Sequence, residues 1–479
     1  MIPDSIKGFR PKNTEIRAKG GHYYVYKVKG VYDKTTKKSK TQYLGCIGQI
    51  YEGIGFVPNT KTPEVAISET KEYGATWFLF SISKEIMKSL TDSFGTDGLR
   101  IYTMALLRLI DNNLRLKTMD IAYEKSYISR LIPSVALSKN TASDFLEKLS
   151  LMRPQMVEFY NSLCPTKCEK IIFDGSSFES QSENPYVIKG YNPHNKGCEQ
   201  IRVMFGFNRD SHMPVYCKPF PGNITDKSAF LSVLAELKMG GNIIILDKGF
   251  FSSPIFDALT EAEADFIIPL SENDTDAKRY NANTLLTGGG QWFFYRKRRI
   301  TYEKVAYSKR KGVTMFVFFD EDLRRVRMSS YFYKEKLDSN SLSDEQDRKV
   351  HEDTKFFGMT FLIASKDMEP KDAYLDYKTR WEIEEMIDTN KNTLSLGTTY
   401  ETKANTFEGW TMINFVASLL FFKADSLIKE KLNGDYTVKD ILLMGEAITK
   451  ATNGNGEWIT LNTTKKLRDT FNKLGVSLA

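Results

Sequence analysis

The chain has 479 residues, of which 41% are hydrophobic and 27% charged, and a net charge of +7. This length exceeds what one hydrophobic core usually serves, so we expect about two to four domains. No run of roughly eighteen apolar residues and no N-terminal apolar segment of signal-peptide type is present, which favours a cytoplasmic protein. Five irregularly spaced cysteines favour free thiols over a structural zinc site.

The positive charge is concentrated at the N-terminus. Residues 1–60 hold eleven Lys/Arg and four Asp/Glu, an excess equal to that of the whole chain. Alternating residues over 21–29 and an apolar run over 43–47 flank the Lys-rich turn 33–40 and predict a small sheet. We expect a basic, β-rich module over 1–75, which either presents lysines to a polyanion or only carries a solubilising loop.

Apolar residues then recur at helical spacing, over 103–110 and 141–156. They predict a helical region over 76–168. A plain helical bundle and a DNA-binding region with a helix for the major groove are both compatible with this pattern, since no residue marks such a helix.

Short apolar strands separated by turns follow over 169–270. Two of them end on a carboxylate, Ile171–Asp174 and Ile243–Asp247. An apolar run that ends in Asp is commonly only a cap or a turn, so either acid alone is a weak signal of a site. Strands mixed with helices indicate an α/β layer fold for this part of the chain.

A strand-like, aromatic and strongly charged segment over 271–355 interrupts this order. Residues 296–311 hold eight Lys/Arg and one Glu. Rings there can stack on unpaired bases while cations hold phosphates; alternatively, the rings enter the core of a small sheet and the cations face solvent. A strand and a long helix over 356–403 resume the layer pattern, and 404–479 is mainly helical.

The long helix, predicted from about Lys371 to beyond Lys391, carries an unusual face. At about 100° per residue, Tyr377, Arg380, Glu384 and Lys391 fall within one arc of about 60°. This face suits a site that holds a metal through Glu and phosphate through Arg and Lys. A solvated helix with an Arg-to-Glu pair is the alternative. Asp388 shares the arc, so geometry alone does not select Glu384.

Tyr377-x2-Arg380-x3-Glu384-x6-Lys391 resembles the YREK signature of bacterial insertion-sequence DDE transposases. Three further motifs resemble motifs of this family and occur in its order across about 170–400: Phe173-Asp174-Gly175-Ser176, Gly222-Asn223-Ile224-Thr225-Asp226 and Leu246-Asp247-Lys248-Gly249-Phe250. The resemblance implies a ribonuclease-H-like mixed sheet flanked by helices. It also implies that 271–355 is the β-rich insertion that these enzymes carry before the helix with the catalytic Glu.

The resemblance implies a role for each motif residue. Asp174, Asp247 and Glu384 would be the catalytic metal ligands, while Tyr377, Arg380 and Lys391 would contact DNA. Oxygen-only ligands favour Mg²⁺ or Mn²⁺ over zinc, and a two-metal site can activate the attacking oxygen and stabilise the leaving one. The implied partners are the terminal inverted repeats of a mobile element and target DNA. A homodimer in the DNA complex and a bacterial, nucleoid-associated location are implied as well.

Further DNA contacts are expected in the predicted insertion. Trp292 is the candidate for stacking on a displaced base, and the basic run beside it supplies phosphate contacts through Arg296, Lys297, Arg298 and Arg299. His194 and Lys196 lie in a loop that is compatible with bordering the site, but a lone His is more often structural.

Three other functions are compatible with part of these signals. A phosphatase of the haloacid-dehalogenase type would need a second acid at position 176, where Ser176 stands. A ribonuclease-H-like nuclease without strand transfer is the closest alternative. A non-catalytic DNA-binding protein derived from a transposase has no positive support, since all three carboxylates are intact.

Overall fold

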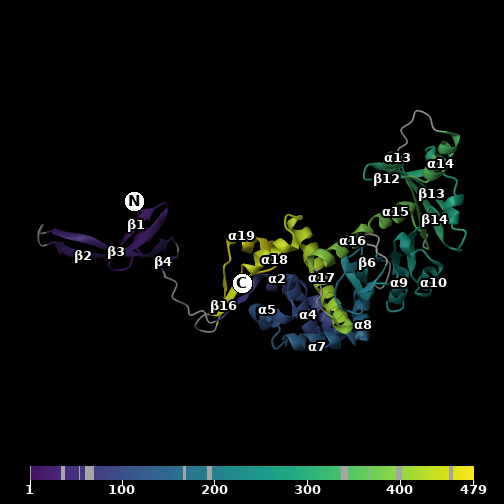
Figure 1. Cartoon of the computed structure of the whole chain (residues 1–479). Coiled ribbons are helices and arrows are strands. Elements are labelled where there is room, and N and C mark those ends of the chain that lie inside the picture. The colour runs from purple at the N-terminus through teal and green to yellow at the C-terminus, as the bar shows by residue number, and fades with distance from the viewer. Residues whose placement is uncertain are drawn as a thin grey trace. The chain divides into compact units, whose positions relative to one another are not determined.

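The computed structural model describes residues 2–33, 38–52, 54–59, 69–164, 169–190, 197–335, 343–365, 367–394, 402–452 and 457–478. The chain divides into two compact units (Figure 1). One consists of Met1–Thr70 with Lys450–Ile459, and the other of Lys71–Thr449 with Thr460–Ala479.

The first unit contains an antiparallel sheet in the order β1-β2-β3-β4. Its elements are α1 (Asp4–Lys7), β1 (Thr14–Lys19), β2 (His22–Asp33), β3 (Lys38–Tyr51) and β4 (Gly55–Pro58). The strands predicted around 21–29 and 43–47 are therefore present. A small core of its own holds the sheet together through Ile6, Ile16, Val25 and Ile50. Of the predicted Lys-rich turn, residues 34–37 lie outside the described residues.

Helices follow over the region that was predicted to be helical. They are α2 (Gly74–Ile82), α3 (Lys84–Phe94), α4 (Thr96–Ile110), η1 (Leu116–Thr118), α5 (Met119–Lys125), α6 (Ile128–Leu131), α7 (Lys139–Ser150) and α8 (Arg153–Leu163), preceded by the short strand β5 (Thr70–Glu72). The long helix α17 (Ala404–Leu432) packs against α4, α7 and β9 (Met213–Pro221). Apolar side chains along α17 thus join this helical region to the sheet.

Helix α17 is long and apolar enough to cross a membrane by length and composition, a feature that the sequence analysis did not find. However, 72% of its most apolar window is buried inside the protein. Its buried side chains include Phe407, Ile413, Val416 and Leu420. Burial on several sides explains its high hydropathy, because a core helix needs no polar face.

The second unit is built on one large mixed sheet, which contains ten strands among the described residues. The strand order is β12-β13-β14-β15-β11-β10-β6-β8-β7, and β9 pairs with β8. The central strands β6, β10 and β11 are parallel to one another, and the other neighbouring strands of this sheet are antiparallel. The strands other than β9 are β6 (Lys170–Glu179), β7 (Ile188–Lys189), β8 (Glu199–Asn208), β10 (Ile243–Ile245), β11 (Asp265–Pro269), β12 (Gln291–Tyr295), β13 (Arg298–Ala306), β14 (Thr314–Asp320) and β15 (Met359–Ala364).

The segment 271–355 is less strand-like than its sequence predicts. Strands β12, β13 and β14 form a hairpin-connected extension of the core sheet, joined to it through β14 and β15. The remainder is largely helical: α11 (Thr275–Arg279), α12 (Asn283–Leu286), α13 (Glu321–Glu335) and α14 (Asp344–Thr354). Helix α13 has no buried side chains, so its sequence lacks the apolar periodicity from which a helix could be predicted.

The predicted continuous helix from 371 past 391 is wrong in detail. Its first part is α15 (Pro370–Lys378), Thr379 and Arg380 interrupt it, and α16 (Trp381–Asp388) continues into the π-helical turn η3 (Thr389–Thr393). The Thr379 hydroxyl donates to the Asp376 carbonyl at 2.7 Å, and its backbone N–H bonds both Leu375 and Asp376. A β-branched residue with a local hydroxyl bond competes with regular helix, which accounts for the break.

The remaining elements complete the two units. Helices α9 (Asp226–Leu234) and α10 (Ser253–Glu261) and the turn η2 (Lys248–Phe250) connect strands of the large sheet (Figure 1). The C-terminal part contains α18 (Val438–Glu446), the paired strands β16 (Thr449–Thr452) and β17 (Trp458–Leu461), and α19 (Lys465–Lys473). The tail is therefore mainly helical, as predicted.

Candidate active site

The first two predicted carboxylates lie at the same level of two neighbouring parallel strands. In the register of β6 with β10, Ile172 lies opposite Ile245. Asp174 and Asp247 each follow two residues later. Asp247 lies just beyond the end of β10, but β6 continues to Glu179, so the predicted strand end at Asp174 is wrong. The Asp174 side chain is 22% exposed and that of Asp247 is 42% exposed.

Arg380 contacts all three predicted acids. Its Nη1 lies 3.5 Å from Asp174 Oδ2, its Nε 3.8 Å from Asp247 Oδ1, and its Nη2 2.7 Å from Glu384 Oε1. Glu384 is one turn further along α16, which makes the last contact an i, i+4 pair. The guanidinium thus gathers three carboxylates from β6, the end of β10 and α16 around one positive group.

The electrostatics of Asp174 reflect its burial. Burial raises the pKa of the Asp174 carboxyl to about 7, and the negative charges of Asp247 and Asp226 add to this, against the opposing effects of Arg380 and the Gly175 N–H. For Arg380, burial lowers the pKa, but the three carboxylates together outweigh it and raise the pKa overall. The site therefore combines desolvation with an excess of negative charge.

Tyr377 and Lys391 lie in the same electrostatic environment. Burial is the largest cause of the raised pKa of the Tyr377 hydroxyl, and the charge of Asp247 is the next. Burial lowers the pKa of Lys391, while Asp388 and Asp174 oppose the shift. The Lys391 ammonium lies 5.2 Å from the centre of the Phe178 ring on β6. Tyr377, Arg380 and Lys391 are thus near Asp174 or Asp247, and Glu384 contacts Arg380, although the helix is interrupted.

Two of the other predicted motifs touch each other beside Asp174. A Cβ at Gly175 would lie 2.1 Å from Asp226 Oδ1, so only glycine fits at this position without displacing the carboxylate. Asp226 is the first residue of α9, whose N-cap Thr225 accepts a hydrogen bond from the Ser228 N–H. Its carboxylate forms an ion pair with Arg202 on β8. The sequence analysis quoted Asp226 only as part of a motif and gave it no role.

Comparisons with known proteins identify the family of the chain. The model of the transposase DDE domain family matches residues 166–420, which contain every residue of the acidic site. The chain belongs to the transposase DDE domain family. One solved structure that the chain matches is the piggyBac transposase synaptic complex with hairpin DNA, determined by cryo-electron microscopy. It is 12% identical, with 78% of each chain covered and a TM-score of 0.40. No curated protein sequence matches the chain.

As a DDE transposase, the protein is an enzyme that cleaves DNA and transfers strands. The mixed α/β sheet agrees with the predicted fold class at this coarse level. The family match favours the transposase interpretation over the phosphatase, the simple nuclease and the non-catalytic DNA-binding protein.

The DNA-contact residues that were predicted in the segment 271–355 of this transposase lie on the β12–β13 hairpin. Trp292 and Phe294 are 51% and 64% exposed on the outermost strand, and the Arg299 guanidinium lies 5.2 Å from the centre of the Trp292 ring. Arg296 and Lys297 form the tip of the hairpin. Both adopt left-handed backbone conformations, with φ of 47° and 64°.

Arg298 differs from its neighbours on this hairpin, since its Nη1 pairs with Asp320 Oδ2 at 2.7 Å. The Asp320 side chain is only 6% exposed. Arg298 therefore satisfies a buried acid in addition to any contact with DNA.

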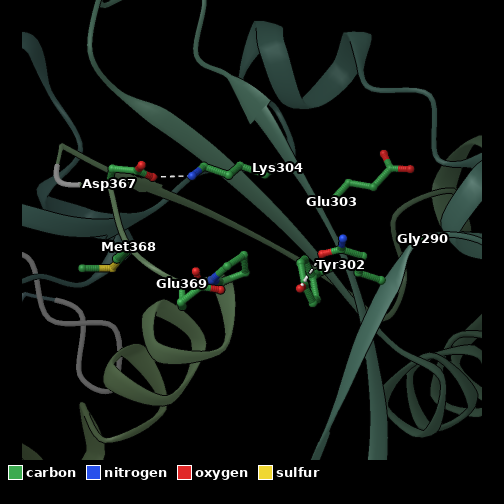
Figure 2. Close-up of a pocket in the computed structure, with 9 residues that line it drawn as sticks. Gly290, Tyr302, Glu303, Lys304, Asp367, Met368 and Glu369 are labelled. Carbon is green, nitrogen blue, oxygen red and sulfur yellow. Dashed lines mark hydrogen bonds and ion pairs between the residues drawn. The ribbon is translucent and has the colours of Figure 1, made fainter.

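A cleft of about 760 Å³ lies away from the acidic site, between the β12–β13 hairpin and the start of α15 (Figure 2). Its lining carries both signs of charge, and Lys304 forms an ion pair across it with Asp367. The Tyr302 hydroxyl donates to Gln291 Oε1 at 2.7 Å. None of the three predicted catalytic acids lines this cleft.

In the described part of the chain, no group of three His, Cys, Asp or Glu side chains is arranged to hold a metal ion. Asp174, Asp247 and Glu384 each contact Arg380 instead, so a metal site built from them requires their carboxylates to rearrange. His194, Lys196 and Cys168 lie outside the described residues, while Cys46, Cys164 and Cys217 carry free thiols.

Proposed function

We propose that Asp174, Asp247 and Glu384 are the catalytic carboxylates of this transposase. The observation that supports this most directly is the contact of Arg380 with all three within the region matched by the family model. Three carboxylates around one guanidinium leave an excess of negative charge that further cations would neutralise. Two unit charges at 4 Å cost about 4 kcal/mol at an effective dielectric of 20, so such a cluster needs cations to form.

We propose that the three carboxylates hold Mg²⁺ or Mn²⁺ at a two-metal site. Their donor set fits these ions, because it consists of oxygen atoms alone and two of the side chains, Asp247 and Glu384, are accessible. When bound, the cations supply charge stabilisation for the attacking and leaving oxygens of a phosphodiester. The carboxylates orient this charge, and the buried position of Asp174 limits access of bulk water to it.

The substrates proposed are the terminal inverted repeats of a mobile element of the insertion-sequence type and a target DNA. Cleavage uses water, and the resulting 3′-hydroxyl then attacks the target strand. Arg380 and Lys391 hold phosphates near the scissile bond and Tyr377 positions the backbone. Trp292 stacks on a displaced base, and Arg296, Lys297, Arg298 and Arg299 hold neighbouring phosphates. We further propose a homodimer in the DNA complex and a nucleoid-associated location in a bacterial cell.

The test is incubation of the protein with labelled element ends, Mg²⁺ and a target plasmid. Strand transfer yields labelled plasmid, whereas simple hydrolysis yields only shortened ends. Replacement of Asp174, Asp247 or Glu384 by Ala should abolish both products while the far-ultraviolet circular dichroism stays unchanged. Retention of Mg²⁺-dependent cleavage in any of the three variants would overturn the assignment of that residue.

A further inference from the structure

The break between α15 and α16 is what determines the position of Arg380. The Arg380 N–H bonds the Tyr377 carbonyl at 3.1 Å, three residues back, and the Glu382 N–H bonds the Thr379 carbonyl at 2.9 Å. Bonds of this i, i+3 type tighten the backbone relative to α-helix and rotate the residues that follow. The geometry of these few residues therefore decides whether Arg380 reaches both Asp174 and Glu384.

Two buried acids stand on either side of this break, and neither belongs to the YREK-like pattern. Asp376, in the last turn of α15, has a side chain that is only 3% exposed. Glu382, in the first turn of α16, has a side chain that is 13% exposed. Buried carboxylates are costly unless they are paired, so their surroundings indicate why they are there.

Both acids face the same turn, which connects β8 to β9. Asp376 Oδ1 lies 3.3 Å from Arg209 Nη1, and Glu382 Oε2 lies 3.3 Å from His212 Nδ1. Arg209 and His212 are three residues apart in this turn. His212 has a left-handed backbone with φ of 53°, as a tight turn of this kind requires. One rigid turn thus contacts both halves of the interrupted helix.

The same turn is tied to the strand that carries Asp174. The Arg209 N–H donates to the Lys170 carbonyl at 2.9 Å, and the Lys170 N–H donates to Asp210 Oδ2 at 2.9 Å. The Lys170 ammonium also contacts Asp376 Oδ1 at 2.9 Å. Lys170 begins β6, and Asp174 follows four residues later on that strand. The β8–β9 turn that contacts the interrupted helix therefore also holds β6, the strand that carries Asp174.

We propose that Asp376 and Glu382 are positioning residues, which the β8–β9 turn holds so that the break places Arg380 against Asp174 and Glu384. The proposal rests on the proposed catalytic role of Asp174, Asp247 and Glu384. It gives the β8–β9 turn a function in catalysis although it contributes no residue to the acidic site. A displacement of about 1 Å of a catalytic group costs about 100-fold in rate, so a small rotation at the break has a large effect.

The test compares single-turnover cleavage of a labelled element end by the full chain and by the variants Asp376→Asn and Glu382→Gln. Each substitution keeps the shape of the side chain and removes its charge. We expect the rate constant of cleavage to fall about 10- to 100-fold, with unchanged affinity for the DNA. Glu369→Gln, which removes an exposed acid at the start of the same helix α15 that makes no side-chain cap bond, is the matched control and should cleave at the wild-type rate.

A double variant that combines Asp376→Asn with Arg380→Lys distinguishes positioning of Arg380 from a purely structural role of Asp376. If Asp376 acts through Arg380, the double variant should cleave no more slowly than Arg380→Lys alone. The proposal would be overturned if the double variant lost the product of the two single-variant rate reductions. It would also be overturned if Asp376→Asn and Glu382→Gln both cleaved at the wild-type rate. If Asp376→Asn does not fold, the cleavage rate of Glu382→Gln, in α16, tests the proposal. Absence of cleavage by the wild-type protein would instead count against the proposed function.

Discussion

Replacement of Asp174 by Asn should make the metal-free protein more stable at alkaline pH. Burial, the largest cause, raises the pKa of this carboxyl from 3.8 to about 7. One pKa unit corresponds to about 1.4 kcal/mol, so ionisation of Asp174 costs the folded state about 4 kcal/mol relative to the unfolded chain. Because the folded state binds the extra proton between about pH 4 and 7, the stability from this group is lost as pH rises across that window.

The assay is urea unfolding of the wild type and Asp174→Asn in EDTA at pH 5 and pH 8. Asn has the same shape and cannot ionise, so the gap in unfolding free energy should widen by about 2–3 kcal/mol between the two pH values, in favour of the variant. Asp247→Asn is the control. It leaves Asp174 buried and should retain most of the fall in stability with pH. A gap that stays constant from pH 5 to pH 8 would refute the reasoning.

The remaining predictions concern Arg380 and the hairpin tip. Arg380→Lys keeps the charge but loses the planar, multi-donor grip, so we expect normal thermal stability and impaired cleavage. Normal values for both would reduce Arg380 to a helix-surface pair worth about 0.2–0.5 kcal/mol. At the hairpin tip, the double variant Arg296→Asn with Lys297→Gly should raise the free energy of unfolding by about 1–2 kcal/mol, because Asn and Gly adopt the left-handed φ of these positions at lower cost. Replacement of both residues by Ala should give no such gain. Both double variants should weaken DNA binding in the absence of metal and lower the slope of log affinity against log salt by about 2, and an unchanged slope would contradict the phosphate contacts.

Sequence alone predicted the acidic site better than it predicted the framework around it. Asp174 and Asp247 were recognisable because each follows a short apolar run, although β6 continues past Asp174 to Glu179. Glu384 could be selected over its neighbour Asp388 only through the resemblance to a family. The arc of side chains was derived for a continuous helix, and Arg380 reaches the acids although the helix is interrupted. The break itself could not be predicted, because a single Thr whose hydroxyl bonds the backbone is too weak a sequence signal.

The residues that were missed share a physical reason. Asp376 and Glu382 are charged, and a charged residue in a helical pattern is normally assigned to the solvated face. Their burial depends on a turn that lies about 170 residues earlier in the chain, and no local pattern reports such a contact. The helix α13 was missed for the opposite reason, because it buries nothing and shows no periodicity to detect. In this transposase, the sequence therefore did not reveal charged residues that a distant part of the chain buries, nor a helix without a buried face.

The position of Arg380 reconciles two roles that compete for one side chain. In the absence of cations, its guanidinium is the group that offsets the repulsion among Asp174, Asp247 and Glu384, and its contacts range from 2.7 to 3.8 Å. Only the contact with Glu384 is within ordinary hydrogen-bond distance for a charged pair, while those with the two aspartates are longer. Cations bound by the carboxylates would take over this neutralisation and leave the guanidinium donors free for a phosphate. The same residue can thus hold the site together before DNA arrives and grip the DNA afterwards, provided that the break beside it keeps Arg380 within reach of both.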